Sequence, residues 1–420
     1  MAQLGDDCFA ASEAPMTTEQ ALVLIGERVR ATAQRETIAL RGAVGRILAR
    51  PLVARRDVPP HDNAAVDGYA FAFSDLDGEA EATLLKVAGR AAAGHPLAAP
   101  VRPGEAARIF TGAAMPAGAD TVAMQEDCRE DGRGRVAIPR GLSPGANRRS
   151  AGEDVATGAT VLERGHRLRP QDIGLIAALG VPEIAVHRRL RVALLSTGDE
   201  IRDPGDTVAP GCVYDANRYL LLALLEGLGC EVEDLGILAD NGDAIRDALR
   251  AAGDGADLIV SSGGVSVGEE DRVRAAVAEL GHLHFWRLAI KPGRPLALGQ
   301  IGATPFIGLP GNPVAAMVTF LRFARPLVLR LAGASDVAPV LFPVRADFEH
   351  GKKKNRREWV RARLVTDAQG GLAARKFARQ GAGILSSLVA SDGLVELPED
   401  MTRLARGTTV AFLPFNEVTP

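Results

Sequence analysis

Residues 257–280 read DLIVSSGGVSVGEEDRVRAAVAEL, and this stretch decides the fold. A short apolar run at 257–260 passes through a loop of Ser and Gly into a segment where Val273, Val277 and Leu280 recur at helical spacing. A short apolar run before a turn predicts a buried strand, and apolar residues three or four apart predict a helix. The stretch therefore predicts one strand–loop–helix unit.

The same alternation extends on both sides of this stretch. Further strands are predicted at 191–195, 232–238, 284–290 and 305–309, and further helices at 216–228, 243–252 and 314–331. Strands and helices that alternate at this length predict a parallel sheet covered by helices on both faces. We expect a central parallel α/β domain over residues 188–333.

The flanking segments differ from the α/β domain in composition and in their pattern of turns. Residues 51–154 are dense in Pro and Gly, with turn pairs such as Asp77-Gly78 and Asp131-Gly132, which predicts a β-rich domain. Residues 334–420 return to short strands and turns and predict a small carboxy-terminal β domain. Residues 17–50 with 155–187 are expected to form a helical linking part. Its helix, over about 18–34 and capped near Thr17, is a candidate for packing on the α/β domain.

Composition excludes several classes of protein. The formal net charge of the 420 residues is -3, and only 4% are aromatic, so nucleic-acid binding by base stacking is not expected. No apolar run approaches the roughly 20 residues that span a bilayer, and the start of the chain does not resemble a secretory signal. The four cysteines show no CxxC spacing, which fits a reducing, cytoplasmic location. The basic run from Lys352 to Arg363 is interpreted as an exposed hairpin.

Five loops follow the predicted strands of the α/β domain. Ligands bind beyond the carboxyl ends of such strands, so all five loops are expected on one rim of the sheet. The candidate substrate-binding residues in these loops are Ser196, Thr197, Gly198, Ser262, Gly263, Gly264, Val265, Ser266, Lys291, Arg294, Pro310, Asn312 and Pro313. The backbone N–H groups of the Gly-rich loop can surround an anion, and Lys291 and Arg294 add positive charge.

Three carboxylates share the same predicted rim. Glu200, Asp240 and Asp271 each follow a different strand. Together with phosphate oxygens, such carboxylates hold Mg²⁺ or a similar hard divalent ion. The rim therefore predicts a phosphorylated substrate and a divalent metal.

Each of these residues also has a simpler structural interpretation. Asp271 could complement a helix dipole, Asp240 could cap the next helix, and Lys291 or Arg294 could be solvated charges. A Gly-rich turn can serve only tight helix packing. The functional interpretation depends on five such loops following five strands.

At this point the residues resemble a known family, the molybdopterin molybdenumtransferases, bacterial counterparts of the carboxy-terminal domain of gephyrin. The matching stretches are DNAAVDGYA at 62–70, TG at 111–112, QE at 125–126, GED at 152–154, STGDE at 196–200, YDAN at 214–217, SSGGVSVG at 261–268, AIKPGRP at 289–295 and GLPGNP at 308–313. No single stretch is decisive, but their order and spacing together are highly specific.

The resemblance implies an elongated, four-domain homodimer whose active site is shared between subunits. It implies binding of adenylylated molybdopterin and molybdate, with Mg²⁺ or another divalent ion, and release of AMP and molybdenum cofactor. The molybdopterin adenylyltransferase and the enzymes that receive the cofactor are candidate partners. The resemblance places the family's catalytic positions on Asp62, Thr111, Asp154, Glu200, Asp240 and Asp271. Of these, Glu200, Asp240 and Asp271 are the implied metal ligands. The implied anion contacts are Arg148 and Arg149.

Two alternatives remain open at this stage. An adenylyltransferase would need only residues 188–333 and would leave Asp62, Thr111 and Asp154 unexplained. A non-catalytic scaffold like gephyrin would not need the three rim carboxylates. The chain also departs from the resembled pattern at Arg294, where Lys is frequent, and at Ala382, where Ser is common.

Overall fold

The computed structural model describes residues 15–263, 272–367 and 370–419. The contacts divide the chain into two compact units. Unit 1 comprises Met1–Ala49, Arg164–Arg169 and Ile184–Pro420, and unit 2 comprises Arg50–Glu163 and Pro170–Glu183. The finer division into four domains stays a prediction.

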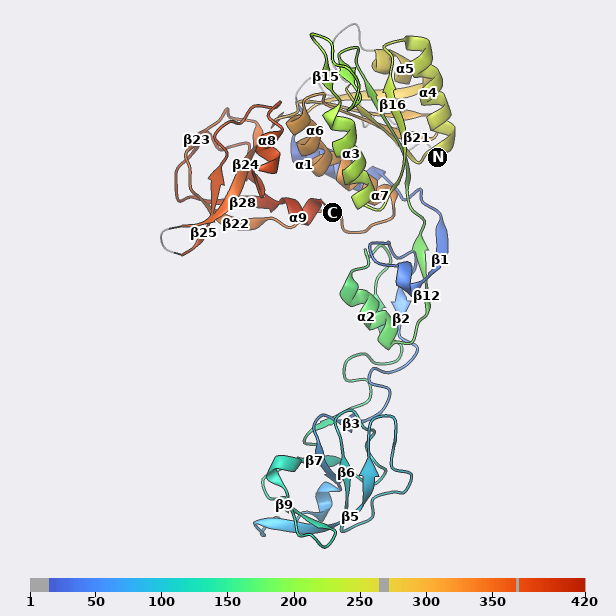
Figure 1. Ribbon diagram of the computed structural model, residues 1–420, viewed down its shortest axis with the longest axis vertical. Coiled ribbons are helices and arrows are strands. Elements are labelled where there is room, and N and C mark those ends of the chain that lie inside the picture. The colour runs from blue at the N-terminus through green and yellow to red at the C-terminus, as the bar shows by residue number, and fades with distance from the viewer. Residues whose placement is uncertain (1–14, 264–271, 368–369, 420) are drawn as a thin grey trace. The chain divides into compact units, whose positions relative to one another are not determined.

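A six-stranded sheet forms the centre of unit 1 (Figure 1). In spatial order its strands are β16 (Glu231–Leu238), β13 (Arg191–Thr197), β17 (Leu258–Ser262), β21 (Thr304–Leu309), β20 (Pro295–Ile301) and β18 (Gly281–Arg287). The first four strands are parallel, which confirms the predicted α/β class.

The sheet also contains a strand that the sequence interpretation missed. β20 runs antiparallel to both neighbours, so the sheet is mixed rather than wholly parallel. β20 and β21 form a hairpin whose turn contains Gly302, with φ 57°. The two-residue turn Gly302-Ala303 is not one of the strong hairpin signals, such as Asn-Gly, which explains why 295–301 was overlooked.

Helices cover both faces of this sheet. Successive strand residues alternate between two apolar cores: Val192 and Leu194 belong to one, and Ala193 and Leu195 to the other. The first core includes side chains from α1 (Thr18–Arg28), α3 (Ala216–Gly227), α6 (Pro313–Thr319) and α7 (Arg325–Leu331). The second includes α4 (Gly242–Gly255) and α5 (Arg272–Leu280), which Figure 1 shows together on one side of the sheet.

Two of the predicted helices have different bounds in the structure. The helix predicted over 18–34 has the predicted capping box at Thr17 but ends at Arg28. The following chain instead pairs outside the helix, because the N–H groups of Thr32 and Ala33 donate to the carbonyl of Leu331. The single helix predicted at 314–331 is α6 and α7 joined by a π-helical segment, Phe320–Ala324.

The carboxy-terminal part of unit 1 is a small closed barrel, shown in orange and red in Figure 1. Its strands pair in a ring because β24 bonds to both β25 and β26. The ring consists of β24 (Arg357–Thr366), β25 (Leu372–Lys376), β22 (Phe342–Ala346), β28 (Thr409–Pro414) and β26 (Gly393–Leu397). The short strand β19 (Ile290–Lys291) pairs with β24 and so joins the barrel to the loop between β18 and β20. Beside the ring lie β23 (His350–Gly351), β27 (Arg403–Leu404), α8 (Ser386–Val389) and α9 (Phe415–Val418).

Unit 2 is β-rich, as predicted. Its main sheet has the order β7 (Thr121–Met124), β4 (Gly68–Phe71), β6 (Glu105–Ile109), β5 (Ala82–Ala91), β9 (Arg135–Pro139) and β8 (Arg129–Glu130). Two strand pairs and a helix complete it: β3 (Asn63–Ala64) with β10 (Arg148–Arg149), β2 (Leu52–Val53) with β11 (Thr160–Leu162), and α2 (Pro170–Ala178). Outside this unit, β1 (Arg35–Ala39) pairs with β12 (Glu183–His187).

Candidate active site

The strand register places the five sequence-predicted loops along one edge of the α/β sheet. Thr197 pairs with Leu238, and Ser262 pairs with both Ser196 and Leu309. β18 has the same direction as β21, because β20 is antiparallel to both, so the loop after Arg287 emerges at the same edge. Residues 198–200, 239–240, 263, 288–294 and 310–313 therefore all follow strands at this rim.

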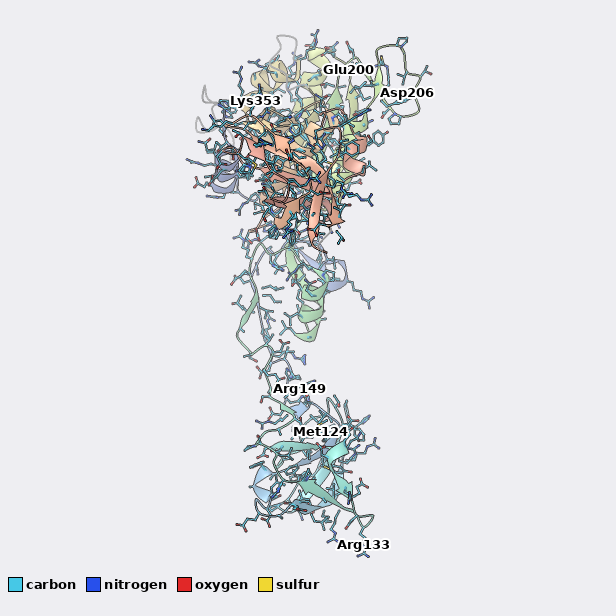
Figure 2. The ribbon with its side chains drawn as sticks, turned by 90° about the vertical axis from the view of Figure 1, so that its left-hand side faces the viewer. Met124, Arg133, Arg149, Glu200, Asp206 and Lys353 are labelled. Carbon is cyan, nitrogen blue, oxygen red and sulfur yellow. The ribbon has the colours of Figure 1, made fainter. Side chains whose placement is uncertain are left out.

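Glu200 begins a long arm after β13. Gly198 has φ 145° and lies directly under the Glu200 side chain, since a Cβ on Gly198 would lie 2.4 Å from a Glu200 carboxylate oxygen. The arm contains β14 (Ile201–Arg202) and β15 (Val213–Tyr214), which pair in parallel, and it includes Asp206 (Figure 2). A side chain at Gly198 would displace Glu200, so the glycine is needed for this approach.

The first turn of α3 ties this arm to the rest of the rim. Arg218 is buried and bonds to Asp203 in the arm, to Asp215 at the helix cap and to Asp234 in β16. Asn217 Nδ2 donates to the carbonyl of Gly311 at 2.7 Å, in the loop after β21. One helical turn thus braces the arm that begins at Glu200 and the loop that contains Asn312.

The predicted metal ligands are only partly within the described chain. Asp240 is bound by Arg272, with 3.1 Å between Oδ1 and Nε. Asp271 lies outside the described residues, as do Gly264, Val265 and Ser266 of the anion loop. Among the residues that the structure describes, no three His, Cys, Asp or Glu side chains gather into a metal site.

A cavity of about 490 Å³, here called cavity 1, lies between the rim and the barrel. From the rim it is lined by Gly263, Lys291, Arg294, Pro310 and Asn312, and from the barrel by His350, Glu358, Arg361 and Gln380. Five sequence-predicted residues therefore converge here with four that were not predicted. Ser196, Thr197, Gly198, Ser262 and Pro313 do not line it.

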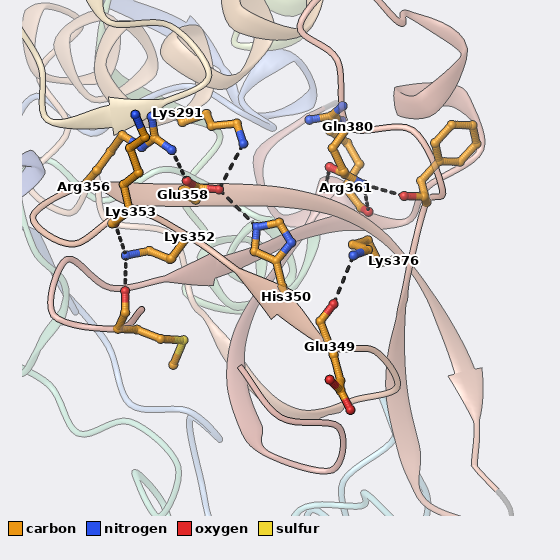
Figure 3. Close-up of polar contacts among 12 residues, drawn as sticks. Lys291, Glu349, His350, Lys352, Lys353, Arg356, Glu358, Arg361, Lys376 and Gln380 are labelled. Atoms are coloured by element: carbon orange, nitrogen blue, oxygen red, sulfur yellow. Dashed lines mark hydrogen bonds and ion pairs between the residues drawn. The ribbon is translucent and has the colours of Figure 1, made fainter. Parts of the chain in front are cut away.

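Glu358 is the one acid in the described lining of cavity 1, and its charge is already compensated (Figure 3). It is 2% exposed, and its carboxylate contacts Lys291 Nζ at 3.4 Å, His350 Nε2 at 3.1 Å and the Arg356 guanidinium. Burial alone would raise the pKa of Glu358, but the bonds from His350 and Arg356 and the charge of Lys291 outweigh it and lower the pKa. The carboxylate stays ionised and holds Lys291 at the cavity.

Arg361 is the strongest site feature that the sequence interpretation missed. It is 1% exposed, donates from Nε to Ser387 at 3.1 Å and from a terminal nitrogen to the Gly381 carbonyl at 3.0 Å (its region is drawn in Figure 3). It forms no ion pair with any acid in the described chain. Burial lowers the pKa of Arg361 to about 10, so it remains charged at neutral pH.

The basic run was therefore interpreted wrongly in part. Lys353 and Lys354 are exposed, as expected of a turn, but Arg361 belongs to the buried part of β24. The burial of five consecutive residues, 358–362, places Arg361 inside the structure although it lies in a basic run.

In unit 2, three loops bring several predicted residues onto one surface. Asp62 Oδ2 lies 3.3 Å from Arg148, and its other oxygen accepts from the backbone N–H of Ala151 at 2.8 Å. Arg149 is opposite Asn63 in the β3–β10 pair. The Met115 N–H bonds to the Asp62 carbonyl, which joins the loop of Thr111 to the same surface.

Thr111 is fixed by a neighbour that the sequence interpretation did not single out. Asp67 Oδ1 accepts from both the backbone N–H and the hydroxyl of Thr111, each at 2.8 Å. These two bonds lower the pKa of Asp67. Asp154 is exposed, and its backbone N–H bonds to the Val58 carbonyl.

The three parts of the chain match three family descriptions in order. Residues 16–180 match the MoeA N-terminal region (domain I and II), residues 193–330 a probable molybdopterin binding domain, and residues 343–415 the MoeA C-terminal region (domain IV). The chain is 38% identical to molybdopterin molybdenumtransferase of Haemophilus influenzae, over 96% of this chain and 99% of the relative.

The chain belongs to the MoeA family. A second member, molybdopterin molybdenumtransferase of Nostoc sp., is 36% identical over 90% of this chain and 88% of the relative. A solved MoeA structure from Pyrococcus horikoshii OT3, titled a molybdopterin biosynthesis protein, has a TM-score of 0.82 and 30% identity, covering 96% of this chain and all of the other. The resemblance stated from the sequence is confirmed.

The helices of this MoeA-family chain give no sign of a transmembrane segment. Within the described residues, none is both long enough and apolar enough to cross a bilayer.

Proposed function

We propose that the chain is a molybdopterin molybdenumtransferase, which inserts molybdenum from molybdate into adenylylated molybdopterin and releases AMP and molybdenum cofactor. Family membership over nearly the whole chain supports this reaction. The structural observation that supports this reaction most directly is cavity 1. There, Lys291, Arg294 and Arg361 meet beside one acid that is already compensated.

Cavity 1 suits a small oxyanion. Arg361 offers a buried guanidinium whose hydrogen bonds within the described chain go only to neutral oxygens, so its charge remains available to a ligand. Lys291 and Arg294 supply a point charge and a planar fork from the rim. We assign molybdate to these three cations. The anion loop from Ser262 to Ser266 takes the phosphoryl groups of the substrate.

We also propose a divalent ion, Mg²⁺ or a similar metal, held by Glu200, Asp240 and Asp271. Glu200 and Asp240 follow adjacent parallel strands, and both offer the oxygen donors that such ions prefer. The Asp240 carboxylate pairs with Arg272 in this structure, and the metal ion would take the place of that partner. When bound, the metal would neutralise negative charge on the adenylate phosphate.

The residues of unit 2 form the second half of the proposal. We propose that the chain is a homodimer in which Asp62, Thr111, Asp154, Arg148 and Arg149 of one copy approach the substrate held by the rim of the other. The bonds from Ala151 to Asp62 and from Thr111 to Asp67 fix these side chains on one surface. We place this reaction in the cytoplasm. The molybdopterin adenylyltransferase and cofactor-receiving enzymes are its proposed partners.

A direct assay tests the reaction. Purified protein is incubated with adenylylated molybdopterin, Mg²⁺ and molybdate, and AMP and active cofactor are measured. We expect molybdate-dependent release of both products, and their loss in Asp271→Ala. Adenylylation of molybdopterin from ATP would favour the adenylyltransferase instead, and neither activity would favour a scaffold.

Arg361 gives a second test of the same proposal. Arg361→Lys keeps the charge but loses the planar fork, so the KM for molybdate should rise about tenfold or more while AMP binding is unchanged. Arg363→Lys, two residues along β24 and outside the lining of cavity 1, is the matched control. Equal effects of both substitutions would remove Arg361 from the site.

A further inference from the structure

A second cavity of about 510 Å³, here called cavity 2, lies beside cavity 1 in unit 1. The two share Arg294 and Pro295 in their linings. Cavity 2 is formed by the end of β18, the loop that leads to β20, and the turn that precedes β24. Neither the proposed reaction nor the family descriptions assigns it a role.

The lining of cavity 2 is strongly cationic. It contains Arg287, Arg294, Lys353, Lys354 and Arg356, and no Asp or Glu within the described chain. Arg356 is paired with Glu358, but the other four form no ion pair with any acid that the structure describes. A concave surface with several cations of one sign concentrates anions from solution.

The turn that carries Lys353 and Lys354 is held in place. Lys352 Nζ donates to the Met401 carbonyl at 2.6 Å, and the Asn355 N–H donates to the Glu399 carbonyl at 2.8 Å. Asn355 has φ 61°, a conformation that Asn tolerates better than most residues. The Arg357 N–H then bonds to the Ala289 carbonyl, which lies on the opposite wall of the cavity. These bonds fix the backbone of the turn that carries the exposed cations (Lys353 is labelled in Figures 2 and 3).

The cavity also has an apolar side. Pro15, Leu288, Ala289 and Pro295 line it together with the cations. Its volume falls within the range of sites for small molecules. Four uncompensated cations match a ligand with at least two negative charges. Arg forks and Lys ammonium groups together are the usual partners of phosphoryl oxygens.

We propose that cavity 2 is a second anion site, which binds a phosphorylated small molecule of diphosphate or nucleotide size. The site shares the rim loop that follows β18, but its cations other than Arg294 lie outside cavity 1, and it goes beyond the proposed reaction. Since Arg294 lines both cavities, a ligand in cavity 2 competes for one of the cations that cavity 1 uses. Occupancy of cavity 2 therefore weakens oxyanion binding in cavity 1, and the reverse holds equally.

Calorimetric titration of the full chain tests the site, with inorganic diphosphate and ADP as separate probes at low ionic strength. Lys353→Gln/Lys354→Gln should weaken diphosphate binding at least about tenfold, by loss of two charge-assisted contacts. Both side chains are exposed, so the Tm should be unchanged. Tighter binding of ADP than of diphosphate, lost in the lysine double variant, would indicate that the nucleoside contacts the apolar side of cavity 2. Equal binding of the two probes would indicate that only the phosphoryl groups are recognised.

Two controls make the result decisive. Arg403→Gln/Arg406→Gln removes the same charge from the same barrel at exposed positions outside both cavities, and should leave binding within about twofold. Lys291→Gln, which changes cavity 1 only, should also retain the diphosphate site. The proposal is overturned if wild-type protein binds neither probe, if both double variants lose binding equally, or if only Lys291→Gln loses it. None of these outcomes bears on AMP release in the assay above, so the two proposals can fail separately.

Discussion

Glu358 is a buried carboxylate whose cationic partners line two different cavities. Its partners Lys291 and His350 line cavity 1, and its partner Arg356 lines cavity 2. A buried carboxylate is costly unless it is paired, and three partners surround this one. Glu358 therefore separates two cationic cavities and limits the repulsion between their walls.

Replacing this carboxylate should change both stability and its dependence on pH. Glu358→Gln should cost about 3 kcal/mol near neutral pH, the lower end for a broken buried pair because Lys291 is 45% exposed. The native pKa of Glu358 lies below its ordinary value of 4.5, so its contribution is fully present above pH 4.5 and is lost as the pH falls through the native pKa. Urea unfolding of both proteins from pH 7 to pH 3 measures the difference, which should shrink only in the acidic part. A constant difference would contradict this coupling.

A second residue-scale prediction concerns Thr111. Asp67→Ala removes both bonds to Thr111, so the hydroxyl loses its fixed direction. We expect kcat for AMP release to fall about 10- to 100-fold with little change in KM, since misplacement of a reacting group costs this much. Asp131→Ala, which removes two backbone bonds and an ion pair with Arg135 in unit 2 outside the three loops, should lose at least as much stability and keep its kcat. Equal losses of kcat would reduce Asp67 to a structural role.

At the scale of elements, the first turn of α3 organises the rim. Arg218 is 5% exposed at its side chain and neutralises three aspartates from three segments. Arg218→Met should destabilise unit 1 by about 3–5 kcal/mol, because it leaves these acids without their counter-charge. Arg250→Met on α4 removes an exposed cation with one partner and should cost no more than about 0.5 kcal/mol. Denaturant midpoints of the two variants test the contrast, and similar midpoints would refute it.

The elements also show what the sequence could and could not predict. Strands β13, β16, β17 and β21 were predictable because their apolar runs are separated by amphipathic helices. β20 was not predicted, because the spacing of apolar residues does not distinguish an additional antiparallel strand from a loop that connects two parallel strands. The rim residues were predictable from the ends of strands, since chain direction fixes that edge.

The barrel's share of the site could not be predicted in the same way. Arg361 and Glu358 reach cavity 1 because β24 pairs with β19, a contact between segments more than sixty residues apart. No local pattern encodes such a pairing. In the sequence, Arg361 stands among seven basic residues between 352 and 363, which hides the one that is buried.

At the scale of the whole molecule, the proposed catalytic residues belong to two units of the same chain. The proposed dimer predicts complementation between Asp62→Ala and Asp271→Ala proteins. After subunit exchange, a mixed dimer has one site with both lesions and one with neither, so its activity should approach roughly half of wild type. AMP release is measured after exchange has been confirmed by mass. No recovery in exchanged dimers would show that each site uses residues of one chain.

The position of α1 has a consequence for synthesis of the protein. Ile25 and Val29 share a core with Leu327 and Leu331, and the Leu331 carbonyl accepts from Thr32 and Ala33. Roughly 300 residues separate these partners, so at ribosomal rates α1 waits about 15–60 s for its neighbour. All of unit 2 is made within that interval. During translation, unit 2 can fold while the apolar face of α1 is still uncovered, so α1 is a target for a chaperone that binds nascent chains.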